Sequence, residues 1–159
     1  MQNMSYQFKI IPNEDLYQII PLVYALNEAK ICKAVLKSRF GEMKNQNYEC
    51  AGIFIDNDLI GVTGLWFCTR HYMGKSVELD HVYIKPEQRG NGIGKQFMKW
   101  IYNYVKEKGC NSMELNTYVQ NYPSHKFYYK PEFDVRFNSS LNEFLFNLKL
   151  EFRRTNSLI

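Results

Sequence analysis

Three closely spaced glycines are the clearest sign of chemistry in this sequence. They lie in the segment Gln88-Arg89-Gly90-Asn91-Gly92-Ile93-Gly94, where an expected strand ends and an expected helix begins. Glycines there let backbone N–H groups converge, and the unpaired amides of a helix start carry partial positive charge. The segment therefore predicts a pyrophosphate site, to which Arg89 and Lys95 add charge. The alternative is a glycine-rich turn without a ligand.

Three other glycine-rich phosphate motifs do not fit. The sequence has no GxxxxGK[ST] segment, which excludes a nucleotide P-loop of that type. A dinucleotide fingerprint needs an acidic residue about 20 positions further on, where Gly109 and Cys110 stand instead. A kinase glycine loop needs more downstream parts than the chain has room for.

The elements before this segment follow from the spacing of apolar residues. Residues 6–11 predict a strand ended by Pro12. Asn13 is expected to cap a helix whose apolar residues recur from Leu16 to Leu26 and which Pro21 kinks or ends early. A second helix is expected over 31–43. Residues 51–55 and 59–69 predict an antiparallel hairpin with its turn at 56–58. Gly61 and Gly64 suggest a bulge or a close approach of something large.

The elements around and after the glycine segment complete the pattern. Residues 77–84 predict a strand stopped by Pro86. The helix that follows Gly92 has a clear apolar face, formed by Ile93, Phe97, Ile101, Tyr104 and Val105. Gly109 is expected to end it as a left-handed cap. A strand over 112–118, a short helix over 121–129, a hairpin of 133–137 with 144–150, and a loose tail from about 153 follow.

The order β-α-α-β-β-β-α-β-α-β-β predicts an α/β (α+β) fold. In it, a mixed and mostly antiparallel sheet is flanked by helices. The sequence shows no linker, repeat or low-complexity segment, so a single domain over 1–159 is expected.

Two motifs in register resemble the GNAT superfamily of N-acetyltransferases. That family's acetyl-CoA motif, Gln/Arg-x-x-Gly-x-Gly/Ala after a strand ending in aliphatic-x-Pro, is similar to the segment from Ile84 to Gly94. Its next signature is similar to Asn121, Ser124, Phe127-Tyr128 and Phe133. The chain departs from it at Glu132, where the family has Gly. The specific match covers about 77–133.

The resemblance implies a binding mode for acetyl-CoA. Its pyrophosphate would lie on the amides of 89–94, with Gln88 and Lys95 at the ends of that segment. Its pantetheine arm would hydrogen-bond the backbone near Val82 and Ile84, and Asn121 would hold it from the other side. One backbone N–H, of Val82 or Tyr83, would polarise the thioester carbonyl.

The resemblance also implies direct acetyl transfer to a primary amine in a ternary complex. Tyr128 is similar to the family's tyrosine acid, which protonates the departing thiolate. Side chains alternate along a strand, so Glu78 and Asp80 are expected on one face, where either could act as the base. An amine that arrives neutral would need neither. His81 is expected on the opposite face as a structural residue.

The acceptor amine is not readable from the sequence. In the family its cleft is built by the first two helices and the loop between the third and fourth strands, so Trp66, Phe67, Tyr72 and Tyr83 could line it. The acceptor could belong to a small molecule, a peptide or a protein. A homodimer is one expected assembly. A catalytically inactive CoA-binding sensor or scaffold is the alternative function.

Composition narrows the class of protein. Hydrophobic residues make up 45% and charged residues 23% of 159, as in soluble globular proteins. The net charge of +4 comes from scattered residues, which argues against a nucleic-acid partner. No apolar run is long enough to span a membrane. Four scattered cysteines indicate reduced thiols in a cytoplasmic protein, and no metal-ligand spacing is present.

Overall fold

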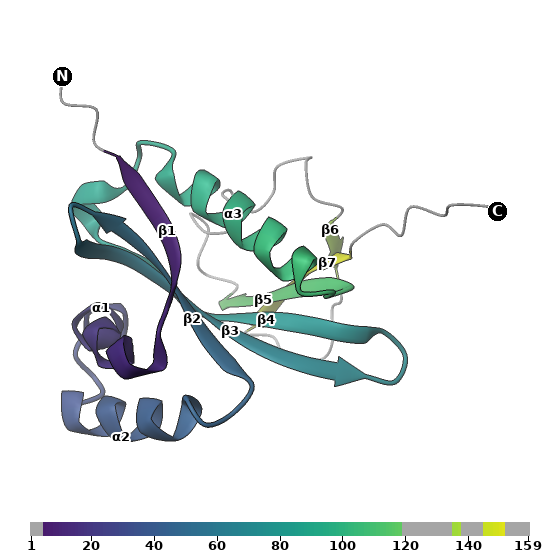
Figure 1. The fold of residues 1–159 in the computed structure, drawn as a ribbon, viewed down its shortest axis with the longest axis horizontal. Coiled ribbons are helices and arrows are strands. Elements are labelled where there is room, and N and C mark those ends of the chain that lie inside the picture. Colours follow the sequence, from purple (N-terminus) through teal and green to yellow (C-terminus); the bar gives the residue numbers. More distant parts are fainter. Residues whose placement is uncertain (1–4, 119–134, 138–144, 152–159) are drawn as a thin grey trace. The chain divides into compact units, whose positions relative to one another are not determined.

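The structure is a computed structural model that describes residues 5–118, 135–137 and 145–151 (Figure 1). The described strands form a seven-stranded sheet in the order β1-β2-β3-β4-β5-β7-β6. The chain divides into two compact units. Unit 1 is Met1–Trp66 with Leu79–Ile101, and unit 2 is Phe67–Glu78 with Tyr102–Ile159. The long strands β3 (Asp58–Arg70) and β4 (Gly74–Ile84) contribute to both units. This mixed α/β fold with a mostly antiparallel sheet confirms the predicted fold class.

The sheet of unit 1 starts from an antiparallel hairpin. β2 (Tyr48–Ile55) pairs with β3 so that Tyr48 lies opposite Trp66 and Cys50 lies opposite Gly64. Asp56 and Asn57 turn the chain with φ of 47° and 70°, as a tight hairpin turn requires. β1 (Tyr6–Ile11) pairs antiparallel with the other edge of β2. The predicted hairpin and first strand are therefore confirmed.

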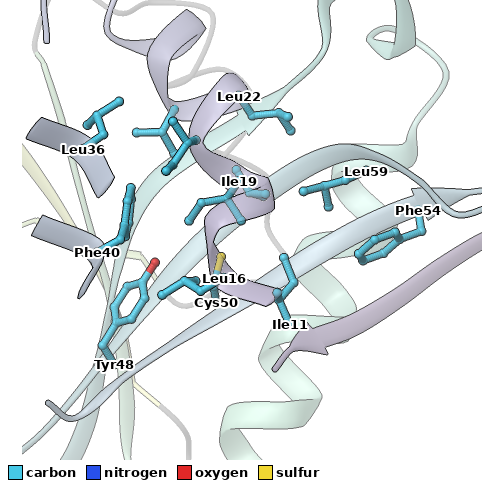
Figure 2. Close-up of a cluster of buried hydrophobic side chains, with 13 residues drawn as sticks. Ile11, Leu16, Ile19, Leu22, Leu36, Phe40, Tyr48, Cys50, Phe54 and Leu59 are labelled. Atoms are coloured by element: carbon cyan, nitrogen blue, oxygen red, sulfur yellow. The ribbon is translucent and has the colours of Figure 1, made fainter. Parts of the chain in front are cut away.

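One face of this sheet is covered by three short helices, which bury a cluster of apolar side chains (Figure 2). They are η1 (Asn13–Ile19), α1 (Ile20–Leu26) and α2 (Lys33–Met43). The helical stretch is interrupted, as expected, but not by a kink at Pro21: a 3₁₀ helix ends at Ile19, and an α-helix begins at Ile20 with Pro21 in its first turn, where a missing N–H is tolerated. The predicted cap is wrong, because Pro12 is the capping residue and the Asn13 amide donates to Lys44 O at 3.2 Å.

The other face of the unit 1 sheet is covered by the part of α3 (Ile93–Glu107) that belongs to unit 1, which ends at Ile101. Ile93, Phe97 and Ile101 are buried, and the Phe97 ring packs against Phe8 of β1 with ring centroids 5.5 Å apart. Trp100 packs against the same Phe8 ring. The predicted apolar stripe of this helix is thus confirmed, and it fixes the first turn of α3 against the sheet.

Unit 2 contains the tip of the β3–β4 hairpin, the end of α3 and the last strands. β5 (Ser112–Tyr118) and β6 (Val135–Phe137) both pair antiparallel with β7 (Leu145–Glu151). Arg70 of β3 donates to Glu114 of β5 at 2.9 Å and to Ser76 of β4 at 2.8 Å, which ties three strands together. Gly109 ends α3 with φ of +80°, as predicted. The helix expected over 121–129 lies outside the described residues.

Candidate functional site

The glycine-rich segment forms an open turn between β4 and α3. After the short 3₁₀ helix η2 (Pro86–Gln88), Gly90 and Gly92 have φ of +83° and +82°. These values favour glycine because a Cβ would strain the backbone. An added Cβ at either position would meet no atom within 4 Å. Both glycines are therefore required by backbone conformation, and they leave open space beside the chain.

The amides of this turn are available to a ligand. Within the described part of the chain, the amides of Gly90, Asn91 and Gly92 donate to no protein acceptor, whereas the Ile93 N–H is capped by Asn91 Oδ1 at 3.1 Å. The Asn91 amide group in turn donates to Tyr6 Oη at 2.9 Å, which anchors the turn to β1. Successive free N–H groups at a helix start form an anion-binding concavity. The amides of Gly90, Asn91 and Gly92 are therefore the ones of this segment that remain candidates for binding a phosphate.

The Arg89 side chain folds back over the end of β4. Its Nε donates to the Ile84 carbonyl at 2.7 Å, and its guanidinium lies 5.3 Å from the centre of the Tyr83 ring. A carbonyl oxygen has a second lone pair, so this bond leaves the Ile84 carbonyl able to accept from a ligand as well. Lys95, in the first turn of α3, is exposed.

A second unusual backbone conformation lies in β4, seven residues before the glycine segment begins. His81 has φ of +38°, which is uncommon for a non-glycine residue and costs about 1–3 kcal/mol. Its Nε2 lies 2.6 Å from Tyr48 Oη. Gly64 makes room for the ring, because a Cβ there would lie 2.4 Å from His81 Nε2. The close approach predicted at Gly64 is therefore confirmed, and the group that approaches is His81.

The turn at His81 interrupts the alternation expected along β4. Asp80 Oδ1 accepts the His81 N–H at 2.7 Å, and Asp80 Oδ2 accepts the Trp66 indole N–H at 3.3 Å. Tyr48 packs against both the Trp66 ring and the His81 ring. The Asp80 carboxylate and the His81 ring thus flank the same aromatic pair, so the expectation of strict opposite faces is wrong at this point.

Burial determines the protonation states of the Tyr48, Cys50 and His81 side chains. Burial raises the pKa of the Tyr48 hydroxyl above its ordinary range and raises the pKa of the Cys50 thiol to about 12. Burial also lowers the pKa of His81, against an opposing effect of the Asp80 charge. The ring of His81 is therefore neutral near pH 7. Its Nδ1 is buried and lacks a hydrogen-bond partner in the described part of the chain.

The remaining predicted residues fall in different parts of the structure. Val82, Tyr83 and Ile84 continue β4 directly after His81 and are half-buried, as is Gln88. Glu78 is half-buried in unit 2, whereas Asp80 is exposed in unit 1. Tyr128 and Asn121 lie outside the described residues. Tyr48 is a further candidate that no local sequence pattern indicated, because its partner is 33 positions away.

Several features bear on other kinds of site. None of the described helices combines the length and apolar character needed to cross a bilayer. In the described segments, no three His, Cys, Asp or Glu side chains are grouped so that they could hold a metal ion. All four cysteines are free thiols.

The lowered pKa of His81 predicts a pH dependence of stability. Below its ordinary pKa of about 6.5 the unfolded chain binds this proton before the folded chain does. The free energy of unfolding should therefore fall as the pH drops from about 6.5 toward the lower pKa in the fold, by at most about 1.4 kcal/mol per pH unit.

Urea unfolding between pH 7 and pH 5 measures this change. His81→Gln should lose part of the dependence, whereas His71→Gln, in the exposed turn after β3, should retain it. If the free energy of unfolding depended equally on pH in His81→Gln and in the wild type, His81 would not be the group responsible.

Comparison with known proteins agrees with this geometry. Over 57 residues the chain is 32% identical to a thialysine N-epsilon-acetyltransferase from Bos taurus, covering 36% of this chain and 34% of that protein. Over 100 residues it is 31% identical to a spermidine N(1)-acetyltransferase from Thermoplasma acidophilum, covering 63% of this chain and 58% of that protein. The matches thus span about one third to three fifths of these relatives.

Solved structures show the same fold. The crystal structure of PaiA N-acetyltransferase from Thermoplasma acidophilum in complex with coenzyme A superposes with a TM-score of 0.67 at 21% identity, covering 94% of this chain and 100% of that one. The model of the acetyltransferase (GNAT) family matches residues 14–133, which include the glycine-rich turn and β4. The chain belongs to the GNAT family of acetyltransferases.

Proposed function

We propose that this protein is an acetyl-CoA-dependent N-acetyltransferase that transfers an acetyl group directly to a primary amine in a ternary complex. One observation carries the proposal: at the start of α3 the amides of Gly90, Asn91 and Gly92 donate to no acceptor among the described residues, and a Cβ added at Gly90 or Gly92 would meet no atom within 4 Å. The family and its structural neighbour with bound coenzyme A support a CoA ligand for this turn. A single N-acetyltransferase domain over 1–159 is part of this proposal.

The residues that follow the strand and the turn would hold the ligand. The amides of Gly90, Asn91 and Gly92 would bind the pyrophosphate, and Arg89 and Lys95 would add positive charge; of the amides expected to bind it, those of Arg89 and Ile93 already donate to Pro86 O and Asn91 Oδ1. The backbone of Val82 and Ile84, with Asn121, would hold the pantetheine arm. When bound, acetyl-CoA supplies a thioester whose carbonyl carbon can be attacked by an amine. The N–H of Val82 or Tyr83 would stabilise the negative charge that develops on the carbonyl oxygen.

Proton movements would be handled by the chain's own side chains. Tyr128 would donate a proton to the departing sulfur. Asp80 or Glu78 would accept a proton from the amine. Two hydrogen bonds fix the Asp80 carboxylate while it stays exposed, which suits a group that meets a substrate from solvent.

The acceptor is proposed as an aliphatic primary amine. The names of two relatives specify thialysine and spermidine as acceptors of those enzymes. Thialysine and spermidine are therefore the first amines to test here, followed by peptides with a free N-terminus. Release of free CoA thiol measures turnover with each amine.

Gly92→Asp should weaken acetyl-CoA binding, because a carboxylate would stand among the amides that hold the pyrophosphate. Ligand at 100 times its dissociation constant stabilises a folded protein by about 2.7 kcal/mol. Thermal melting should show a clear upward shift for the wild type with acetyl-CoA and little shift for this variant.

Gly109→Asp is the matched control. Gly109 has φ of +80° and open space beside it, so the same substitution imposes the same backbone strain. This control should keep the full ligand-induced shift. A full shift for Gly92→Asp would refute the phosphate assignment, and no shift for the wild type would refute the proposed function.

Tyr128→Phe should lower kcat by about a hundredfold while the melting shift with acetyl-CoA stays within error, because only the proton donor is lost. Thiol release with saturating amine measures kcat. Unchanged turnover would remove Tyr128 from the mechanism. A wild type that binds acetyl-CoA but acetylates none of the amines would instead favour the inactive CoA-binding module.

A further inference from the structure

We propose that Tyr48 is a positioning residue for acetyl transfer, which acts by holding His81 in its left-handed conformation within β4. The inference rests on the proposed function, because it concerns how the Asp80 carboxylate and the Val82 N–H are aimed at the reacting groups. Tyr48 lies on β2, 33 positions before His81.

The conformation of His81 needs a restraint from outside its own strand. At φ of +38° the residue departs from the extended region, and such strain persists only where the surroundings over-determine it. The ring is fixed on several sides. Tyr48 Oη lies 2.6 Å from Nε2, the bare Gly64 backbone lies beneath the same edge, and Phe40 meets the ring edge-on at 5.5 Å.

The backbone beside His81 is fixed as well. The Asp80 carbonyl accepts the Thr63 hydroxyl at 3.2 Å, and the Asp80 carboxylate accepts the His81 N–H and the Trp66 indole N–H. Three hydrogen bonds from β3 and from the turn itself thus hold Asp80. The Tyr48 hydroxyl supplies the matching restraint on the His81 side chain.

The chemistry of the ring argues against simple space-filling. A buried polar atom without a partner is destabilising, and among the described residues His81 Nδ1 finds no partner. An apolar side chain would fill the space without that penalty. What an imidazole provides here is a directional bond to Tyr48. That bond suits a neutral ring, because a neutral imidazole can either accept from the tyrosine hydroxyl or donate to it.

The consequence for the reaction follows from the chain order. The ψ angle of His81 sets the direction of the Val82 N–H, and its φ angle sets the direction from which Asp80 enters. A displacement of about 1 Å at a reacting group can cost about a hundredfold in rate. The Tyr48–His81 bond should therefore affect kcat while leaving the phosphate-binding turn intact.

Tyr48→Phe tests this, because it removes only the hydroxyl that meets His81. We expect kcat to fall by about ten- to a hundredfold, with KM for acetyl-CoA within about twofold of the wild type. Tyr17→Phe is the matched control: Tyr17 packs against the same apolar cluster from η1, and its substitution should leave kcat unchanged. A kcat for Tyr48→Phe equal to that of Tyr17→Phe would overturn the proposal.

Two substitutions at His81 separate the ring from the backbone. His81→Gly removes the strain of a positive φ but also the bond to Tyr48, so we expect a folded protein with a low kcat. His81→Gln retains a polar group that can reach the Tyr48 hydroxyl. Its log kcat should therefore recover at least half of the difference between His81→Gly and the wild type. Full activity of His81→Gly would show that only the backbone shape matters and would overturn the role of Tyr48.

A measurement without turnover distinguishes this inference from the proposed function. In ¹⁵N-labelled protein, Tyr48→Phe should shift the amide resonances of His81 and Val82, while those of Gly90 and Gly92 stay in place. Unchanged resonances at His81 and Val82 would overturn the inference even if the enzyme is active. An inactive wild type with shifted resonances would refute the proposed function and the catalytic role, but not the restraint on His81.

Discussion

Backbone amides can hold a phosphate only where the fold has not already used them, and this constraint shapes the connection from β4 to α3. In an ordinary strand or helix interior every N–H is paired. The chain leaves the strand through Pro86, turns twice through glycines with positive φ, and enters α3 with the amides of three successive residues that no described residue accepts. Phe97 packed on Phe8 and Asn91 bonded to Tyr6 hold that helix start in place.

The face of the unit 1 sheet that buries the apolar cluster under η1, α1 and α2 also carries the unusual backbone conformation of His81 in β4. Tyr48 belongs to the cluster under η1, α1 and α2 and at the same time meets His81. Packing of the helices is thereby connected to the backbone of β4, one residue before the N–H groups proposed to polarise the thioester. The stability of this apolar cluster and the geometry of the proposed site depend on the same side chains.

Local patterns predicted most of the elements. The turn Asp56-Asn57, the stripe of α3 and the cap at Gly109 each depend on residues close in sequence, and each is confirmed. The start of the first helix was predicted incorrectly, because whether Pro21 kinks one helix or begins another depends on packing. Strands β3 and β4 extend further than expected, since their polar ends, such as Ser76 and Arg70, pair with each other in the sheet.

One part of the candidate site could be predicted from local sequence, and another part could not. The glycine turn could be predicted because it lies within seven consecutive residues. The turn at His81 could not, because nothing in a histidine specifies a positive φ and its partner lies on another strand. Gly64 gave the one usable signal: it indicated a close approach without naming the approaching group.

The most direct test is a titration of ¹⁵N-labelled protein with acetyl-CoA, in which the amide resonances are monitored by NMR. We expect saturable shifts of these resonances, largest at Gly90, Asn91 and Gly92 and smaller along Val82–Ile84. Binding that leaves the resonances of Gly90, Asn91 and Gly92 unchanged would contradict the central claim that these amides hold the pyrophosphate.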